Sequence, residues 1–292
     1  MRIALFGTRL ESKDLTHIQQ LITILESSNA SLTVYAPFYK SIREHLTFLK
    51  EPHCFHGKED IPTDTSFLLS IGGDGTMLGT LPFVHDRKLP VLGINTGRLG
   101  FLSSVSKDHI QKALDEIFAG GYTLDRRTLL RLNCADNPFG DINYALNEVS
   151  INKSDPLVML NIKVYVNEQY LNTYWADGLL VATATGSTAY SMSCGGPIIT
   201  PGSHCFVITP IASHNLSVRP IVIPDESVIR IHITGRERSY MVGLDSRRAE
   251  FNAPTDFMLK RDHVTFDMIS PRSEEFFNTI REKLMWGLDI RN

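Results

Sequence analysis

The sequence predicts an α/β N-terminal domain with a parallel sheet, an all-β, sandwich-like C-terminal domain, and a final helix. In residues 1–124, apolar strand-like runs alternate with segments of helical spacing, as in helix-covered parallel sheets. In residues 125–271, short β-rich runs follow one another between Gly, Pro, Asn and Asp clusters, which is typical of a sandwich. Residues 272–292 return to helical spacing, and we expect this helix to pack back on the body of the protein because an isolated helix of that length is marginal.

The first domain carries the elements that would position a ligand. Helices are expected at 12–27, 38–49, 74–85 and 106–119, and strands at 2–7, 31–36, 67–71 and 89–95. Ligands of parallel sheets bind beyond the carboxyl ends of the strands. The glycine-rich segments at 72–73 and 95–100 both lie at such ends.

Composition narrows the function classes. The chain has 292 residues, 42% hydrophobic and 21% charged, with a formal net charge of −3, which argues against a generally nucleic-acid-binding surface. No run of about 18 apolar residues suggests a membrane-spanning helix, and the N-terminal apolar run is too short for a signal peptide. Four cysteines without C-x-x-C spacing favour reduced thiols over a metal site. We therefore expect a cytoplasmic protein without membrane or nucleic-acid partners.

The stretch 67–78, FLLSIGGDGTML, is the first candidate site. It predicts a buried strand, a tight glycine turn and a helix that begins near Asp74, whose free amides can face phosphate. At this position Asp74 could be a general base, a metal ligand or a helix cap. The turn could equally be structural, since the chain has neither a G-x-x-x-x-G-K-[ST] loop nor, here, the G-x-G-x-x-G pattern.

Two further segments have a composition suited to a nucleotide. The stretch 175–197, WADGLLVATATGSTAYSMSCGGP, combines small residues and hydroxyls that can cradle phosphate or ribose, although a Ser/Thr-rich loop is the alternative. Within it, Asp177 precedes a strand, and Tyr190 could stack on a base or fill a core. Asn147 and Glu148 interrupt a strand pattern; they could bind ribose hydroxyls or the adenine amine, or lie solvated on an edge strand.

Six segments together give the chain its resemblance to a known family. They are GGDGTML at 72–78, NTGRLGFL at 95–102, NEVSI at 147–151, DGLLVATATGSTAYSMSCGGP at 177–197, SHNLSVRPIVIP at 213–224 and EKLMW at 282–286. In this order they resemble the NAD kinase family, in the superfamily of diacylglycerol, sphingosine and phosphofructo-kinases. GGDGT is shared across that superfamily, whereas the NE pair with the 177–190 segment is more specific to NAD kinases.

The resemblance implies ATP-dependent phosphorylation of the 2′-hydroxyl of the adenosine ribose of NAD, which gives NADP, at a site between the two domains. Asp74 would be the catalytic base, and Asp177 would bind the nicotinamide side, within one chain or from a neighbouring subunit. Gly72, Gly73, Gly75 and Thr76 would cradle phosphate with Mg²⁺. The implied NAD-binding residues are Asn147, Glu148, Asp177, Thr185, Thr188, Ala189, Tyr190, Ser193, Phe101 and Asp245.

The sequence departs from the family pattern at three places. Ala184 and Ser213 stand where proline is common, and Ser246-Arg247 replaces Gly-Gln after Asp245, which puts a cation near that residue. Two other functions remain as hypotheses: a lipid kinase that shares GGDGT, and a nucleotide-binding sensor without turnover. The family is commonly dimeric or tetrameric, so we expect a homo-oligomer. ATP or polyphosphate could be the donor, and NADH a second acceptor.

Overall fold

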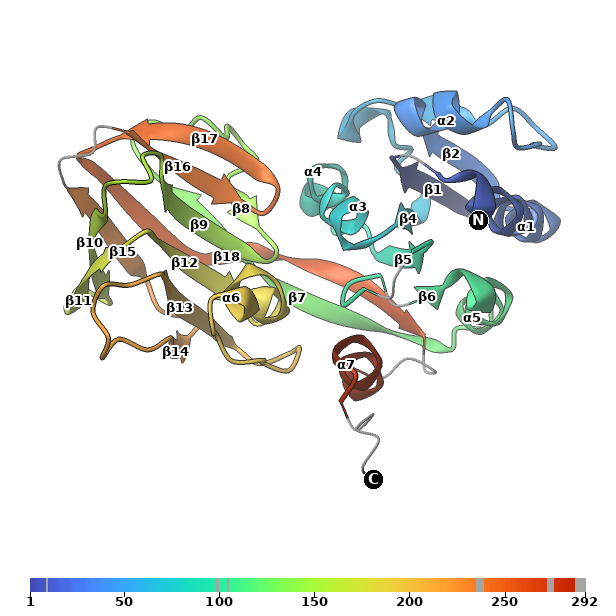
Figure 1. The fold of residues 1–292 in the computed structure, drawn as a ribbon. Coiled ribbons are helices and arrows are strands. Elements are labelled where there is room, and N and C mark those ends of the chain that lie inside the picture. The colour runs from blue at the N-terminus through green and yellow to red at the C-terminus, as the bar shows by residue number, and fades with distance from the viewer. Residues whose placement is uncertain (9, 98–99, 104, 235–238, 272–275, 287–292) are drawn as a thin grey trace. The chain divides into compact units, whose positions relative to one another are not determined.

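The computed structural model describes the chain except for residues 9, 98–99, 104, 235–238, 272–275 and 287–292. Two compact units are present: Met1–Arg126 with Phe266–Asn292, and Arg127–Thr265. The predicted boundary after residue 124 falls inside strand β7 (Tyr122–Asn133), and the one after 271 falls at the end of strand β18 (Thr255–Pro271). Both strands therefore begin in one unit and end in the other (Figure 1).

The first unit is built on a parallel sheet, as the alternation of strands and helices predicts. Its strands follow the order β3-β2-β1-β4-β5-β6, and the end of β18 pairs with β5 in parallel. Their bounds are β1 Arg2–Gly7, β2 Ser31–Tyr35, β3 His53–Phe55, β4 Thr65–Gly72, β5 Val91–Asn95 and β6 Val105–Ser106. Gly72, the last residue of β4, is in register with Asn95, the last residue of β5. The carboxyl ends of these two strands thus lie side by side.

Helices cover both faces of this sheet because its strands are apolar on both sides. Ile3 and Leu5 of β1 belong to the core that α1 (Leu15–Ser27) and α5 (Ile110–Phe118) cover. Phe6 points to the opposite face, where its ring lies 5.3 Å from that of Phe83 in α4 (Leu81–Val84). Alternation along a strand sends successive side chains to opposite faces, so a continuous apolar run such as β1 requires a cover on each.

Two of the predicted helices are shorter than expected. The helix predicted at 38–49 is α2, Ala36–Ile42, which already starts at the residue before Pro37. The helix predicted at 74–85 is divided into α3 (Asp74–Leu78) and α4. Gly79 is the C-cap of α3, and Pro82 lies in the first turn of α4, where its missing N–H costs no hydrogen bond.

The second unit contains two antiparallel sheets around one core, which confirms the predicted sandwich-like domain. One sheet has the order β11-β10-β15-β18 and the other β14-β13-β12-β9-β16-β17. Buried side chains of both sheets, such as Ile162 of β10 and Val181 of β12, belong to the same apolar cluster. The bounds are β8 Tyr144–Ala145, β9 Glu148–Lys153, β10 Leu160–Val166, β11 Gln169–Ala176, β12 Gly178–Thr183, β13 Cys205–Ile211, β14 Ile221–Pro224, β15 Ile229–Thr234, β16 Ser239–Leu244 and β17 Arg247–Asn252.

The chain returns to the first unit at its end. Helix α7, Phe276–Leu284, belongs to that unit, and its Ile280 is buried. In the described part of the chain, no helix is long and apolar enough to cross a membrane.

Candidate active site

Asp74 lies where β4 ends and α3 begins, and the segment after β5 returns over its carboxylate. The amide of Phe101 donates to Oδ2 at 2.8 Å, and the amides of Leu102 and Ser103 both donate to Oδ1 at 3.0 Å. A Cβ on Gly100 would lie 1.9 Å from Oδ1, so this close approach requires glycine. Three consecutive amides thus hold the carboxylate in one orientation.

The helix-cap alternative for Asp74 is wrong. Gly73 occupies the N-cap position of α3, and Asp74 is the first helical residue, with its side chain turned to the 101–103 amides instead. The side chain keeps 30% of its surface exposed. A partly exposed, fixed carboxylate at the carboxyl ends of two adjacent parallel strands is available to a ligand that binds there.

Among the described residues, one cation faces this carboxylate. Lys283 of α7 places its Nζ 3.6 Å from Asp74 Oδ2 and 4.3 Å from the centre of the Phe101 ring. The three residues come from three distant segments of the first unit. Lys283 lies in the EKLMW motif, but nothing in the sequence shows which side chain a C-terminal helix directs toward Asp74.

In the second unit, Asp245 shapes the turn that carries Asn147 and Glu148. Its Oδ1 accepts from the amides of Asn147 at 2.8 Å and Glu148 at 3.2 Å, and its Oδ2 accepts from Leu146 at 2.9 Å. The Asp245 amide in turn donates to the Glu148 carbonyl at 3.1 Å. Asp245 itself has φ 53°, a left-handed conformation that Asp tolerates better than most residues. Its carboxylate therefore bonds the backbone of the turn.

Glu148 is 8% exposed, and its Oε2 has no hydrogen-bond partner among the described residues. Burial, and then the negative charge of Asp245, raise the pKa of Glu148 to about 8, although the Tyr190 amide opposes this rise. Glu148 opens β9, which lies between β12 and β16, so the edge-strand alternative for the Asn147–Glu148 pair is wrong. A neutral carboxyl group can both donate and accept hydrogen bonds, as a ligand hydroxyl requires.

The small residues of 183–190 lie against this turn. Thr183 Oγ1 donates to the Leu146 carbonyl at 2.6 Å and accepts from the Gly186 amide at 3.2 Å. A Cβ on Gly186 would lie 2.1 Å from the carbonyl oxygen of Asn147, so a larger residue would push the two segments apart. Burial is the main cause that raises the pKa of Tyr190, and the charges of Glu148 and Asp177 add to it. Thr183, Gly186 and Tyr190 therefore form one polar cluster with the Asn147–Glu148 turn.

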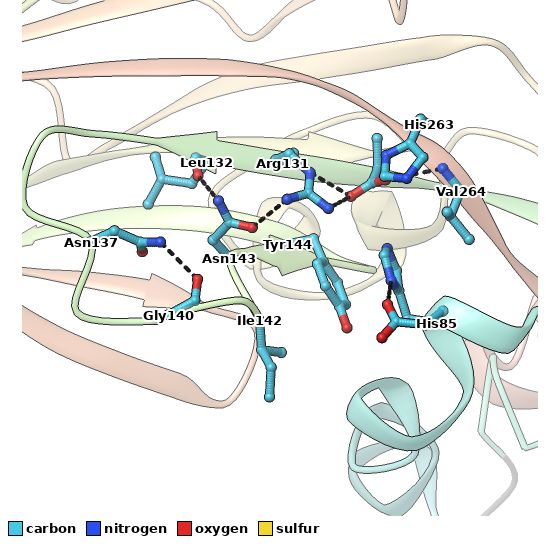
Figure 2. Close-up of polar contacts among 12 residues, drawn as sticks. His85, Arg131, Leu132, Asn137, Gly140, Ile142, Asn143, Tyr144, His263 and Val264 are labelled. Atoms are coloured by element: carbon cyan, nitrogen blue, oxygen red, sulfur yellow. Dashed lines mark hydrogen bonds and ion pairs between the residues drawn. The ribbon is translucent and has the colours of Figure 1, made fainter. Parts of the chain in front are cut away.

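Two arginines fix the chain that leads into Asn147. Arg131 forms an ion pair with Asp262 at 2.8 Å and donates to Asn143 Oδ1 at 2.7 Å, and Asn143 donates to the Leu132 carbonyl at 2.8 Å (Figure 2). Arg247 donates to the carbonyls of Ile142 and Tyr144. The cation that replaces glutamine after Asp245 is thus directed at backbone carbonyls.

Comparison with known proteins shows the family of this chain. Residues 13–122 match the model of the ATP-NAD kinase N-terminal domain, and residues 146–259 match that of the ATP-NAD kinase C-terminal domain. The chain is 41% identical to an NAD kinase of Flavobacterium psychrophilum, with all of both chains covered. It is 40% identical to one of Porphyromonas gingivalis, with 99% of each chain covered. The chain belongs to the NAD kinase family.

Solved structures of NAD kinases and of a related NADH kinase share the fold. Yeast NADH kinase complexed with NADH superposes with a TM-score of 0.87 at 22% identity, over all of this chain and 89% of that one. An NAD kinase from Archaeoglobus fulgidus in complex with ATP gives a TM-score of 0.71 at 22% identity, over 98% of each chain. The NAD kinase fold thus extends over both units.

The structure groups the site residues expected of an NAD kinase within each unit. Phe101 lies beside Asp74 in the first. In the second, the polar cluster gathers the Asn147–Glu148 turn with Tyr190, while Asp177 forms an ion pair with Lys153 at 2.6 Å. Thr185 accepts from Arg127 of β7 at 3.2 Å, a partner that the sequence does not indicate because the two residues are 58 positions apart. Thr188, Ala189 and Ser193 follow on the same segment.

The buried Glu148 predicts a pH-dependent stability. Its pKa rises from 4.5 in the unfolded chain to about 8 in the fold, so the folded state binds more protons than the unfolded state between these pH values. The free energy of unfolding should therefore fall, by a few kcal/mol, as pH rises from about 4.5 to about 8. Melting temperatures of the wild type and of Glu148→Gln at pH 5.5 and 8 check this. The melting temperature of the wild type should fall more over this range than that of the variant, and an equal change in both would contradict the prediction.

Proposed function

We propose that this protein transfers the γ-phosphoryl group of ATP to the 2′-hydroxyl of the adenosine ribose of NAD, with Asp74 as general base. The observation that carries the proposal is the Asp74 carboxylate, which three amides fix at the carboxyl ends of β4 and β5 while 30% of its side chain stays exposed. A sugar hydroxyl is a poor nucleophile near neutral pH, and a positioned carboxylate accelerates its attack by accepting the proton.

The second unit supplies the recognition of NAD. Glu148 offers a buried oxygen that has no hydrogen-bond partner in the described part of the protein, and Asn147 beside it offers an amide that can both donate and accept. Ribose hydroxyls and the adenine amine have the complementary groups. Phe101, Asp177 and Asp245 belong to the proposed NAD site as well, Asp245 by holding the turn, together with Thr185, Thr188, Ala189, Tyr190 and Ser193.

The glycine turn is the proposed phosphate cradle. A Cβ at Gly73 or Gly75 would meet no atom within 4 Å, so the turn leaves open space above its backbone. Gly72 has φ 152° and packs against Thr76, which fixes the direction in which the turn leaves the strand. Phosphoryl transfer requires mostly that the phosphate is positioned and that its charge is neutralised. Backbone amides of the turn can neutralise part of that charge.

ATP-dependent phosphoryl transfer uses a divalent cation, and we infer Mg²⁺ bound to the phosphates of ATP. Among the described residues, no three His, Cys, Asp or Glu side chains are grouped to hold a metal ion, and amides and an ammonium group already surround Asp74. These side chains do not form a Mg²⁺ cage, so the proposed steps are derived from the protein groups alone.

The assembly and location follow from the family resemblance. We propose that the protein is a homo-oligomer, and the molar mass from light scattering of the purified protein tests this. The cytoplasm is the proposed compartment, which agrees with four cysteines that are all free thiols. We also propose that the protein belongs to the wider superfamily that includes diacylglycerol and sphingosine kinases.

A single assay tests the activity. The protein is incubated with Mg-ATP and NAD, and NADP is measured with an NADP-specific dehydrogenase. Formation of NADP at enzyme-like rates supports the proposal. Nucleotide binding without product would indicate a sensor, and activity only on lipid vesicles would indicate a lipid kinase; either outcome rejects it.

Glu148→Gln is expected to raise KM for NAD about 5- to 20-fold with little change in kcat. The amide nitrogen that replaces one carboxyl oxygen cannot accept a hydrogen bond, so one contact to the nucleotide is lost. Initial rates at varied NAD concentration measure the effect, with Glu250→Gln on β17, an exposed position, as control. An unchanged KM would remove Glu148 from the NAD site.

A further inference from the structure

Lys283 faces the remaining open position on the Asp74 carboxylate. A carboxylate has two oxygens and about four lone-pair positions. The amides of Leu102 and Ser103 use two positions on Oδ1, and the amide of Phe101 uses one on Oδ2. The fourth position is on Oδ2, the oxygen that Lys283 approaches to 3.6 Å. This distance allows ion pairing but exceeds that of a hydrogen bond, so the position still accepts a donor.

The contact has two anchors. The ammonium group also lies 4.3 Å from the centre of the Phe101 ring, within the range of a cation–π interaction. Phe101 is itself bonded to Asp74 through its amide, so the three groups form a closed triangle. Ile280, three residues earlier on α7, is buried and fixes the helix that carries Lys283. The side chain of Lys283 keeps 33% of its surface exposed.

We propose that Lys283 is a positioning residue for phosphoryl transfer, which holds Oδ2 of Asp74 toward the acceptor hydroxyl and then pairs with the transferred phosphoryl group. This inference rests on the proposed function and deepens it. The hydroxyl donates to the open position on Oδ2. Its oxygen forms a bond to the γ-phosphorus, its proton passes to Oδ2, and the bond from the γ-phosphorus to the bridging oxygen breaks with its electron pair on ADP.

The proton transfer changes the partner of Lys283. Once Oδ2 carries the proton, Asp74 is neutral and the ion pair is lost. The new phosphate monoester beside it carries negative oxygens, which an ammonium group stabilises through charge-assisted hydrogen bonds. Among the described residues, Lys283 is the charged side chain within ion-pair distance of Asp74; the other groups that face the carboxylate are the three amides. The charge of Lys283 is therefore placed to act at the transition state, where it raises kcat.

The test compares Lys283→Met, which keeps the apolar stem but removes the charge, with Lys283→Arg, which restores the charge. Lys283→Met is expected to lower kcat about 10- to 100-fold with KM for NAD within about threefold of the wild type, and Lys283→Arg to recover most of the loss. Arg281→Met is the matched control, since it removes one cation from the same helix at a residue that bonds Asn278 instead.

Melting temperatures separate this effect from a loss of fold, and Lys283→Gln serves as the second variant if the Met variant does not fold. A kcat within twofold of the wild type, an increase in kcat, an equal loss in Arg281→Met, or no recovery with Arg would each overturn the inference. In all four cases the wild type still makes NADP, so the proposed function stands. A wild type that makes no NADP instead rejects the proposed function.

Discussion

Asp74→Asn is expected to lower kcat for NADP formation by about 10²–10⁴-fold while NAD and ATP still bind. The asparagine side chain has nearly the same shape, but it cannot accept the proton of the ribose hydroxyl. Its oxygen can still accept from the Leu102 and Ser103 amides, but its nitrogen would face the amide of Phe101, so the 101–103 segment keeps two of its three hydrogen bonds. Single-turnover rates with radiolabelled ATP measure the loss, and calorimetric titration measures NAD binding.

Two controls separate the chemistry of Asp74 from its structural bonds. Asp86→Asn makes the same chemical change at a surface carboxylate of the first unit that pairs with Lys58, and it should leave kcat unchanged. Asp74→Glu keeps the charge but moves it by about one methylene length; it should also be slow, because fixed geometry accounts for much of the rate. Near-normal turnover in Asp74→Asn, with intact melting behaviour, would exclude Asp74 as the base.

The sequence was sufficient for the architecture because its patterns are local. The run before Gly72 is apolar at nearly every position, which predicts a buried strand, and β4 is such a strand. The single helix predicted at 74–85 is wrong for an equally local reason, because Gly79 and Pro82 both disfavour a continuous helix.

The site was predictable in its residues but not in its bonds. Asp74, Asn147 and Glu148 could be singled out because polar residues interrupt apolar patterns at strand ends. The partner of the Asn147 amide is Asp245, 98 residues away, whereas the family resemblance implied only that Asp245 lies near the nucleotide. No periodicity relates two such distant positions, and an aspartate after a strand looks the same whether it binds a ligand or a turn.

Asp74 and Asp245 show how one hydrogen-bond pattern can serve two purposes. Each carboxylate accepts from three consecutive amides, 101–103 in one case and 146–148 in the other. The first fixes the aspartate itself, which the proposed mechanism needs in one orientation. The second fixes the turn that carries Asn147 and Glu148, the residues proposed to bind NAD. Removing the second carboxylate should therefore affect binding rather than the chemical step.

Asp245→Asn is expected to raise KM for NAD about 10- to 100-fold and to lower the free energy of unfolding by about 1–3 kcal/mol. Asparagine tolerates the left-handed conformation at φ 53°, so the backbone is not strained by the change. Its oxygen can replace Oδ1 as acceptor for Asn147 and Glu148, but its nitrogen would then face the amide of Leu146, where two donors oppose each other. Steady-state kinetics and urea denaturation measure the two effects.

The outcome depends on whether the turn or the charge of Asp245 matters to NAD. Ser246→Ala changes the next, exposed residue and should leave both KM and stability unchanged. If Asp245 held only the turn, NAD binding and stability would fall together, and a structure of the variant would show the Asn147–Glu148 backbone displaced. If KM rose in a variant whose stability and turn were unchanged, Asp245 would contact NAD directly. An unaltered KM would mean that the three amide bonds do not set the orientation of Glu148.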